Sequence, residues 1–295
     1  MEISQLPLNA LRAFEASARL NSFTKAGLEL CVSQTAISHQ VRLLEDLLGV
    51  TLFTRLPRGV VLTDEGQTLL PVLSDAFRRM STMLANFQNG SYRDILTVGV
   101  VGTLLNGWLL PRLPRFSAAH PGIDLRLKTN NNRADILADG LDYCLRFGDG
   151  AWHGTNAVPL LDAPLSPVCS PAAASRLQTP ADLLREPLLR SYRADEWALW
   201  FTAAGLTAPP PRGWMFDSSV GMVAAVTQNA GVGLVPVRMF AHDIAAGRIL
   251  QPFPQTVTTG RYWLTWLKSR EENPVMQAFH HWLLEEIRAG DSATG

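Results

Sequence analysis

The residues from Ser33 to Arg42 include six side chains that can bond to bases or phosphates of a nucleic acid. They are Ser33, Gln34, Thr35, Ser38, His39 and Arg42. Glutamine can bond adenine bidentately, and serine and threonine can bond bases or phosphates. Arg55 and Arg58 follow shortly afterwards, where they can reach phosphates or the minor groove. The helical pattern alone leaves two interpretations open, a DNA-binding segment and a plain helical module.

A second group of hydroxyls follows two predicted strands. Gly102 and Thr103 come after strand 95–101, and Ser218 and Ser219 come after strand 214–217, each pair opening a helix. Free N–H groups and the positive end of a helix dipole suit a carboxylate or a phosphate. Two such ends can face each other across a crevice, although a threonine or serine there can equally be a simple N-cap.

Other kinds of site are excluded by the motifs. The sequence has no G-x-S-x-G nucleophile elbow, and its three cysteines lack metal-ligand spacing. Gly231-Val232-Gly233 lacks the third glycine of a dinucleotide loop. His280 and His281 are adjacent on a predicted helix and point about 100° apart, so they make poor metal ligands. We therefore expect no enzyme, no cofactor and no metal, with a cytoplasmic hydrolase as the alternative.

The composition sets the scale of the molecule. The chain has 295 residues, 26 basic and 26 acidic, and 47% of its residues are hydrophobic. This length predicts about two domains of roughly 100 to 200 residues. Because the net charge is zero, nucleic acid must be bound by a local basic patch. The N-terminus carries Glu2 and no long apolar run, so we expect a cytoplasmic protein that binds no membrane.

The first 63 residues are predicted to form helices and a hairpin that would position the first group. Apolar spacings of three and four predict a helix from Leu8 to about Leu20. Further helices are expected at 23–30 and at 34–48, the latter capped by Ser33 and closed by Gly49. Residues 51–63 are typical of a strand, a turn and a second strand. Two short helices joined by a tight break form a helix-turn-helix.

A longer helix is predicted from Thr63, its N-cap, to about residue 89. Its apolar residues follow a heptad seam, which is typical of a helix that pairs with another helix. They are Leu69, Leu73, Ala76, Met80, Met83 and Phe87. The alternative is an amphipathic helix on its own domain. Pro71 lies inside the pattern and predicts a kink or a later helix start.

Beyond residue 91, strands and helices alternate, which predicts α/β units around parallel sheets, either one large sheet or two lobes. The expected strands are 95–101, 123–129, 143–148, 164–169, 187–191, 214–217, 232–236 and 262–268. The expected helices are near 103–118, 133–139, 180–185, 195–204, 218–229, 236–246 and 273–289.

The run from Ser22 to Gly66 resembles the DNA-binding signature of the LysR-type transcriptional regulators. The matching positions are Ser22-Phe23-Thr24, Ala26, Leu30, Ser33-Gln34, Ala36, Ser38, Leu44-Glu45, Leu48-Gly49, Leu52-Phe53, Arg55, Arg58, Leu62-Thr63 and Gly66. Gly27 departs from the usual alanine, and glycine can weaken a helix by up to about 1 kcal/mol. The resemblance implies a winged helix-turn-helix at 6–63 and a dimerising linker helix at 64–90. It also implies a two-lobed effector domain at 91–295, similar to periplasmic binding proteins.

Segments of the second half resemble the AmpR-type β-lactamase regulators within this family. They are VGVVGT, NNRADILADGLDY, GAWHGT, QTPADLL, LLRSYRADEWALW, FDSSV and PVRMF. The resemblance implies control of a β-lactamase gene: a UDP-linked muramyl pentapeptide holds the repressing state, and anhydro-muramyl peptides switch on transcription. We expect lobe I at about 91–162 and 267–295, and lobe II at about 163–266.

The same resemblance assigns residues to the effector site. Thr103, Ser219 and Tyr262 match positions that contact the muramyl peptide, with Ser218 as the competing serine, and Asp135 matches a position linked to switching. Without the resemblance, Tyr262 is a core aromatic and Asp135 a first-turn helix acid. Double-stranded promoter DNA and a second copy of the chain are the implied partners, with a homotetramer left open. The alternative function is a LysR-type regulator of another operon with a different small anionic effector.

Overall fold

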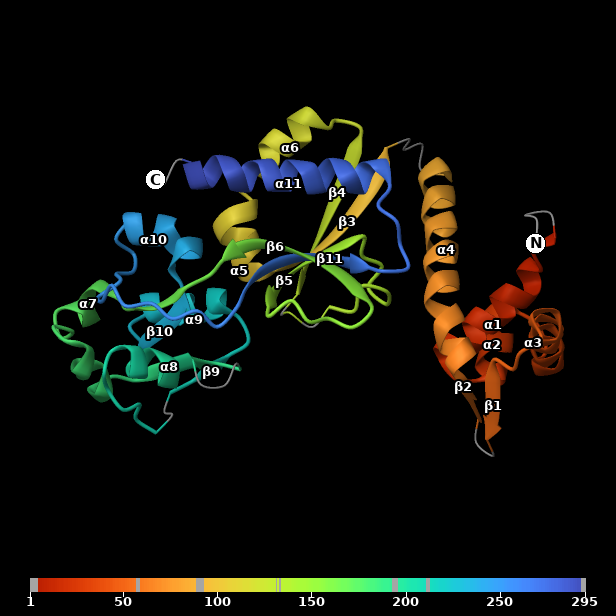
Figure 1. Cartoon of the computed structure of the whole chain (residues 1–295), viewed down its shortest axis with the longest axis horizontal. Helices are drawn as coiled ribbons and strands as arrows, with labels where there is room; N and C mark the ends of the chain where they lie inside the picture. Colours follow the sequence, from red (N-terminus) through yellow and green to blue (C-terminus); the bar gives the residue numbers. More distant parts are fainter. Residues whose placement is uncertain are drawn as a thin grey trace. The chain divides into compact units, whose positions relative to one another are not determined.

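The computed structural model describes residues 5–56, 59–88, 93–130, 132, 134–192, 196–210 and 213–292. The chain folds as two units, Met1–Tyr92 and Arg93–Gly295 (Figure 1). Each unit has its own hydrophobic core, and each is described separately below. In the described part of the chain, no helix is long and apolar enough to cross a membrane.

The first unit contains the predicted helices and hairpin. Its elements are α1 (Leu8–Leu20), α2 (Phe23–Leu30), α3 (Gln34–Leu48), β1 (Phe53–Leu56), β2 (Gly59–Leu62) and α4 (Asp64–Gln88). The caps explain these bounds. Ser22 and Ser33 accept hydrogen bonds from the amides of Lys25 and Ala36, while Gly49 ends α3 in the left-handed conformation.

An aromatic cluster holds α1, α2 and the hairpin together. The ring of Phe53 on β1 lies 5.4 Å from that of Phe14 and 5.3 Å from that of Phe23, measured between centroids. Ile37, on the inner face of α3, is buried in the same core. Not every apolar position points inward, because Leu8 at the start of α1 is 53% exposed.

The long helix α4 runs without interruption from Asp64 to Gln88, so Pro71 is its eighth residue and does not mark a later helix start. Thr63 caps it, as predicted, by accepting a hydrogen bond from the amide of Gly66. Leu69 and Leu73 pack against the core of their own unit. Farther along, the apolar face is uncovered in the single chain, as shown by Met80, which is 49% exposed, and Met83, which is 51% exposed.

The second unit contains a five-stranded sheet in the order β4-β3-β5-β11-β6. Its strands are β3 (Asp94–Val101), β4 (Ile123–Asn130), β5 (Tyr143–Gly148), β6 (Thr155–Asp162) and β11 (Arg261–Leu267). Helices α6 (Leu113–Ala119) and α11 (Pro274–Ser292) lie together along one side of this sheet, through contacts of Phe116 with Phe279 and Trp282 (Figure 1).

A four-stranded sheet with the order β7-β10-β8-β9 forms the second lobe. Its strands are β7 (Leu165–Val168), β8 (Leu188–Ser191), β9 (Met215–Phe216) and β10 (Val232–Pro236). The helices are α7 (Pro171–Ala174), the 3-10 helix η3 (Pro180–Arg185), α8 (Glu196–Ala203), α9 (Ser219–Thr227), the 3-10 helix η4 (Val237–Phe240) and α10 (Ala241–Ala245). The expectation of two lobes rather than one large sheet is confirmed.

Three expectations about this unit are wrong. The sheets are mixed, because β11 runs antiparallel to β5 and β6, and β10 runs antiparallel to β7. Strand β6 was not predicted. Residues 136–140 form turns where a helix was expected near 133–139. A further adjustment concerns residues 261–266, which were assigned to lobe II but form most of β11 in the five-stranded sheet.

The two lobes share an apolar contact in which a glycine is required. The helix expected near 103–118 is divided into α5 (Gly102–Leu104), the π-helix η2 (Leu105–Leu109) and α6. Gly107 in η2 packs against η4 of the other lobe, and a Cβ added there would lie 2.0 Å from the carbonyl oxygen of Met239. Side chains of both lobes form one continuous core, so the lobes are firmly packed together on this side.

Candidate functional site

Helix α3 presents the first group of polar residues on its outer face. Gln34, Thr35, His39 and Arg42 are exposed, and Ser38 is half-buried. The Ser33 hydroxyl is occupied as the N-cap, where it accepts the amide of Ala36 at 3.1 Å. The N-terminal turn of such a helix is the part that enters a major groove. The helix therefore offers several polar side chains on one accessible surface.

The turn between α2 and α3 fixes how this surface is presented. Cys31 takes a left-handed conformation with φ of 56°, and the amide of Val32 donates to the carbonyl of Gly27 at 2.9 Å. A Cβ on Gly27 would lie 2.8 Å from the carbonyl oxygen of Val32. The glycine thus permits a close approach of the turn, a role beyond the loss of helix propensity expected from the sequence.

An acidic residue of α3 holds the hairpin, which is the wing of this domain. Glu45 Oε1 accepts the amides of Leu52 at 2.8 Å and Phe53 at 3.3 Å. This carboxylate is therefore used inside the domain and is turned away from the outer face of α3. Arg55 lies in β1 opposite Val60. Arg58 lies outside the described residues.

The second group of hydroxyls lines a single cavity of about 470 Å³ in the unit of residues 93–295. Five predicted effector residues meet there: Gly102, Thr103, Ser218, Ser219 and Tyr262. The other lining residues are Val101, Asn130, Asn132, Phe147, Ser191, Tyr192, Phe216, Asp217 and Pro236. The volume lies within the range of about 300 to 1,000 Å³ that is usual for small-molecule sites.

The ends of two strands create this cavity between the lobes. Strand β3 ends at Val101 and turns directly into α5, while β9 ends at Phe216 shortly before α9. The two helices α5 and α9 contact each other, so the predicted meeting of two strand-to-helix junctions does occur. Thr103 is 9% exposed. Its hydroxyl is therefore accessible mainly through the cavity.

The structure distinguishes the two serines at the start of α9. Ser218 is the N-cap, and its hydroxyl accepts the amide of Val220 at 3.3 Å. Ser219 is the first helical residue, and its hydroxyl has no hydrogen-bond partner among the residues that the structure describes. Ser219 is therefore the serine whose hydroxyl is available to a bound molecule.

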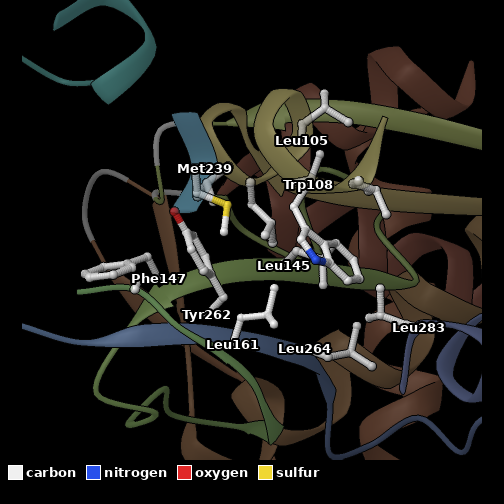
Figure 2. Close-up of a cluster of buried hydrophobic side chains, with 14 of the residues drawn as sticks. Leu105, Trp108, Leu145, Phe147, Leu161, Met239, Tyr262, Leu264 and Leu283 are labelled. Atoms are coloured by element: carbon white, nitrogen blue, oxygen red, sulfur yellow. The ribbon is translucent and has the colours of Figure 1, made fainter. Parts of the chain in front are cut away.

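Tyr262 forms the buried wall of the cavity. It lies on β11 opposite Phe147 on β5, and the two rings meet edge-to-face with centroids 5.4 Å apart. Figure 2 shows the Tyr262 ring beside Phe147, with its hydroxyl oxygen pointing away from Leu161. The tyrosine is 2% exposed. It is thus both a core aromatic and a lining residue, which unites the two interpretations made from the sequence.

Several lining residues were missed. Asn130 ends β4, Asn132 lies just beyond it, and Ser191 ends β8 with Tyr192 next to it. The rule that polar residues at the carboxyl ends of strands converge was applied to two strands only. Applied to every strand, it would have found these as well. No lysine, arginine or histidine is among the described lining residues.

Asp135 is not among the residues that line the cavity. It is exposed on the turn that follows β4, and its Oδ1 accepts the amides of Leu137 at 2.9 Å and Ala138 at 3.0 Å. The turn continues to Asp139, whose carboxylate accepts the amide of Asp135. These bonds hold a compact surface turn in place of the expected helix.

A buried ion pair lies elsewhere in this unit. Arg270 and Asp142 form an ion pair, with the second oxygen of Asp142 accepting the amide of Thr97 at 2.6 Å. Burial, and a hydrogen bond to Glu272, raise the pKa of Tyr143. Among the described residues, no group of three or more His, Cys, Asp or Glu side chains could hold a metal ion.

Two domains of one protein family match the chain, one in each unit for almost their whole length. Residues 8–67 match the bacterial regulatory helix-turn-helix proteins of the lysR family, and residues 89–288 match the LysR substrate binding domain. The chain belongs to the LysR family. In this LysR-family regulator, the helix-turn-helix of α2 and α3 is the DNA-binding element and the second unit is the small-molecule-binding domain.

Curated and solved proteins of the same family are similar over the whole chain or over one unit. The HTH-type transcriptional activator AmpR of Pseudomonas aeruginosa is 60% identical over 282 residues, 95% of each chain. The effector domain of AmpR from the same species is 56% identical, with a TM-score of 0.67, and covers 68% of this chain and 99% of its own.

A third similar structure carries substitutions. It is the effector binding domain of Citrobacter freundii with one threonine-to-valine, one serine-to-alanine and one tyrosine-to-phenylalanine change. It is 48% identical with a TM-score of 0.65, and covers 66% of this chain and 100% of its own. Each change removes one side-chain hydroxyl. Threonine, serine and tyrosine hydroxyl groups are also what this regulator gathers in its cavity.

Proposed function

We propose that this regulator controls a β-lactamase gene in the cytoplasm, and that cell-wall muramyl peptides switch it between repression and activation. The observation that carries the proposal is the cavity that unites Thr103, Ser219 and Tyr262 in a chain 60% identical to an AmpR activator. The chain acts in this proposal as a switch and carries out no catalysis.

The DNA contacts follow from the exposed face of α3. Gln34 is placed to read adenine, while Thr35, Ser38 and His39 can bond base edges or phosphates. Ser33 at the N-cap lies at the end of the helix that would approach the groove. Arg42 is placed to contact a phosphate, and from their place in the sequence we expect Arg55 and Arg58 to add phosphate contacts that fix the register.

The effector is proposed to bind mainly through neutral donors. Thr103, Ser219, Tyr262 and Gly102 line the cavity, where the hydroxyls and the Gly102 amide can bind the carboxylates and amides of a peptide. A UDP-linked muramyl pentapeptide exceeds the cavity, so we place only its peptide end inside. The Citrobacter freundii variant that lacks three hydroxyls supports the emphasis on these side chains. We assign Asp135 to switching, outside the cavity.

A second copy of the chain is the proposed partner of α4. The exposed apolar residues Val72, Met80, Met83 and Leu84 lie on a helix of 25 residues and are not covered within the chain. Pairing this helix with its copy would bury them and would place two α3 helices on one DNA site. Whether two such dimers assemble into a tetramer depends on contacts of the second unit.

Replacing a seam residue by a charge tests the pairing. Met83→Asp should convert dimers to monomers at micromolar concentration, because two carboxylates would oppose each other in an apolar seam. Light scattering after size exclusion measures the mass. Ser81→Asp, at an exposed position of the same helix outside the seam, introduces the same charge and is the matched control. A dimer that survives Met83→Asp would contradict the proposed interface.

Footprinting on the promoter of the neighbouring β-lactamase gene tests the function as a whole. The wild-type protein should protect a site, and the UDP-linked muramyl pentapeptide should change its extent or its bend. Thr103→Val should abolish the response to the ligand and leave promoter affinity nearly unchanged, because it removes one hydroxyl without changing the shape of the side chain. Protection that ignores the peptide in the wild type would favour the alternative, a regulator with another small anionic effector.

A further inference from the structure

The cavity opens beside the end of strand β3, where its neighbour β5 continues farther in the five-stranded sheet. Strand β3 pairs with β5 only as far as Val100 opposite Leu145, since β3 then ends and turns into α5. Strand β5 continues to Gly148, paired on its other side with β11. Among the described residues, the main chain of β5 beyond Leu145 therefore has no strand partner on the β3 side, at the point where the effector cavity begins.

The side chain of Asn132 takes the place of the missing strand. Its Oδ1 accepts the amide of Phe147 at 2.9 Å, and its Nδ2 donates to the carbonyl of the same residue at 2.6 Å. One carboxamide thus satisfies both main-chain groups of Phe147, as a neighbouring strand would. Asn132 is itself held by Asn130, whose side-chain oxygen accepts its amide at 2.9 Å.

The residue held in this way supports the cavity wall. The ring of Phe147 packs edge-to-face on that of Tyr262, and Asn132, Phe147 and Tyr262 all line the cavity. Movement of the Phe147 main chain would therefore move the surface on which the Tyr262 ring rests. The geometry points to Asn132 as a positioning residue of the effector site, which fixes Phe147 and through it the Tyr262 hydroxyl.

Backbone conformation gives a simpler reason for an asparagine here. Asn132 has φ of 66°, and asparagine tolerates this left-handed region better than most residues. If conformation were its only role, glycine would serve at least as well, because it has no Cβ. A glycine substitution keeps the backbone conformation and removes the two side-chain hydrogen bonds to Phe147. It therefore separates a conformational role of Asn132 from a positioning role.

The first test measures binding of the UDP-linked muramyl pentapeptide to the full chain by calorimetry, and it rests on the proposed function. Asn132→Gly should weaken binding by about tenfold, through loss of the two hydrogen bonds that hold Phe147. The matched control is Asn229→Gly, which changes another left-handed asparagine, φ 60°, that bonds Ser170 away from the cavity lining. Unchanged affinity in Asn132→Gly would overturn the assignment.

A pH profile adds a readout that loss of packing would not give. In Asn132→Asp, a neutral carboxyl reproduces one donor and one acceptor, whereas a carboxylate cannot donate. Its affinity relative to the wild type should therefore recover as the pH falls from about 6 through about 4, the ordinary range of an aspartate, and that of Asn132→Gly should not. The nearby titratable and charged groups are Tyr262, Asp217, Arg146 and Cys144, and the ratio to the wild type removes their contribution.

A ligand-free measurement keeps this inference separate from the proposed function. With carbon-13-labelled tyrosine, the Tyr262 ring signals, assigned by Tyr262→Phe, should shift in Asn132→Gly and stay in place in Asn229→Gly. If the wild type fails to bind the pentapeptide, the proposed effector is wrong, and these signals still decide the role of Asn132. Unshifted Tyr262 signals in Asn132→Gly would overturn the positioning role of Asn132.

Discussion

The three cysteines lie in different surroundings that predict different reactivities. Cys31 is exposed, whereas Cys144 and Cys169 are buried. Burial raises the pKa of Cys144, and it raises the pKa of Cys169 to about 11, with a smaller contribution from Glu186. Because the thiolate is the nucleophile, both buried thiols should be almost inert at neutral pH.

Alkylation of the native protein tests this expectation. Iodoacetamide at neutral pH should add one group per chain, at Cys31, and Cys31→Ser should abolish the addition. Cys169 should begin to react only as the pH approaches about 11 or when the chain unfolds, since its raised pKa keeps it protonated below that range. Labelling of Cys169 in the native state at neutral pH would contradict the structure and would revive a thiol-dependent hydrolase.

At the residue scale, the place of a side chain could be predicted where the residues next to it in the sequence determine it. Thr103 and Ser219 follow strands and open helices, so their meeting in one cavity follows from strand ends alone. The same rule could place Asn132 near the cavity, but it could not predict that its side chain bonds the main chain of Phe147. Its role depends on β3 ending before β5 does, and this is set by pairing between residues distant in sequence.

Among the elements, the wing of the DNA-binding unit depends on one acid of α3. The amides of Leu52 and Phe53 are bonded by Glu45, and both residues are buried. Glu45→Ala should leave two buried N–H groups without an acceptor and destabilise this unit by about 1 to 3 kcal/mol. Urea unfolding followed by hydrogen exchange of the α1–α3 amides measures the loss.

The matched control keeps the acceptor. Glu45→Gln preserves an oxygen at the same distance from the main chain and should retain most of the stability. Promoter affinity should follow the same order, wild type, Glu45→Gln and Glu45→Ala, because the acid orients the hairpin that carries Arg55. Equal stability of all three proteins would show that the hairpin is held by its apolar contacts alone.

Element prediction succeeded where the pattern was local and periodic. Helices α2 and α3 begin and end at the predicted residues because their caps are encoded in adjacent positions. Strand β6 was missed because Pro159 interrupts it. The strand tolerates this proline at the edge of the sheet, beside the register shift opposite Tyr262 and Trp263. The turn at 136–140 replaces a helix because Asp135 bonds the following amides instead.

On the scale of the whole molecule, two separately packed units predict two unfolding events. Buried residues of the first unit, from Ala10 to Val60, form one core, and the second unit has cores of its own. The lobes of the second unit share a core through Gly107 and Met239, so they should melt together. Scanning calorimetry of the full chain should therefore resolve two transitions instead of three.

Ligands should move these transitions independently, and this separates the functions of the two units. A molecule that binds only the folded state stabilises it by RT ln(1 + [L]/Kd), about 2.7 kcal/mol at a hundredfold excess over Kd. The muramyl pentapeptide should raise the transition of residues 93–295, and promoter DNA should raise that of residues 1–92. In Thr103→Val the peptide should lose its effect while the effect of DNA persists.

If the peptide raised both transitions equally in the wild type, the units would be coupled already in the absence of DNA. The effector signal would then reach α3 through the stability of the first unit, in addition to any change in how two α3 helices are spaced on the promoter.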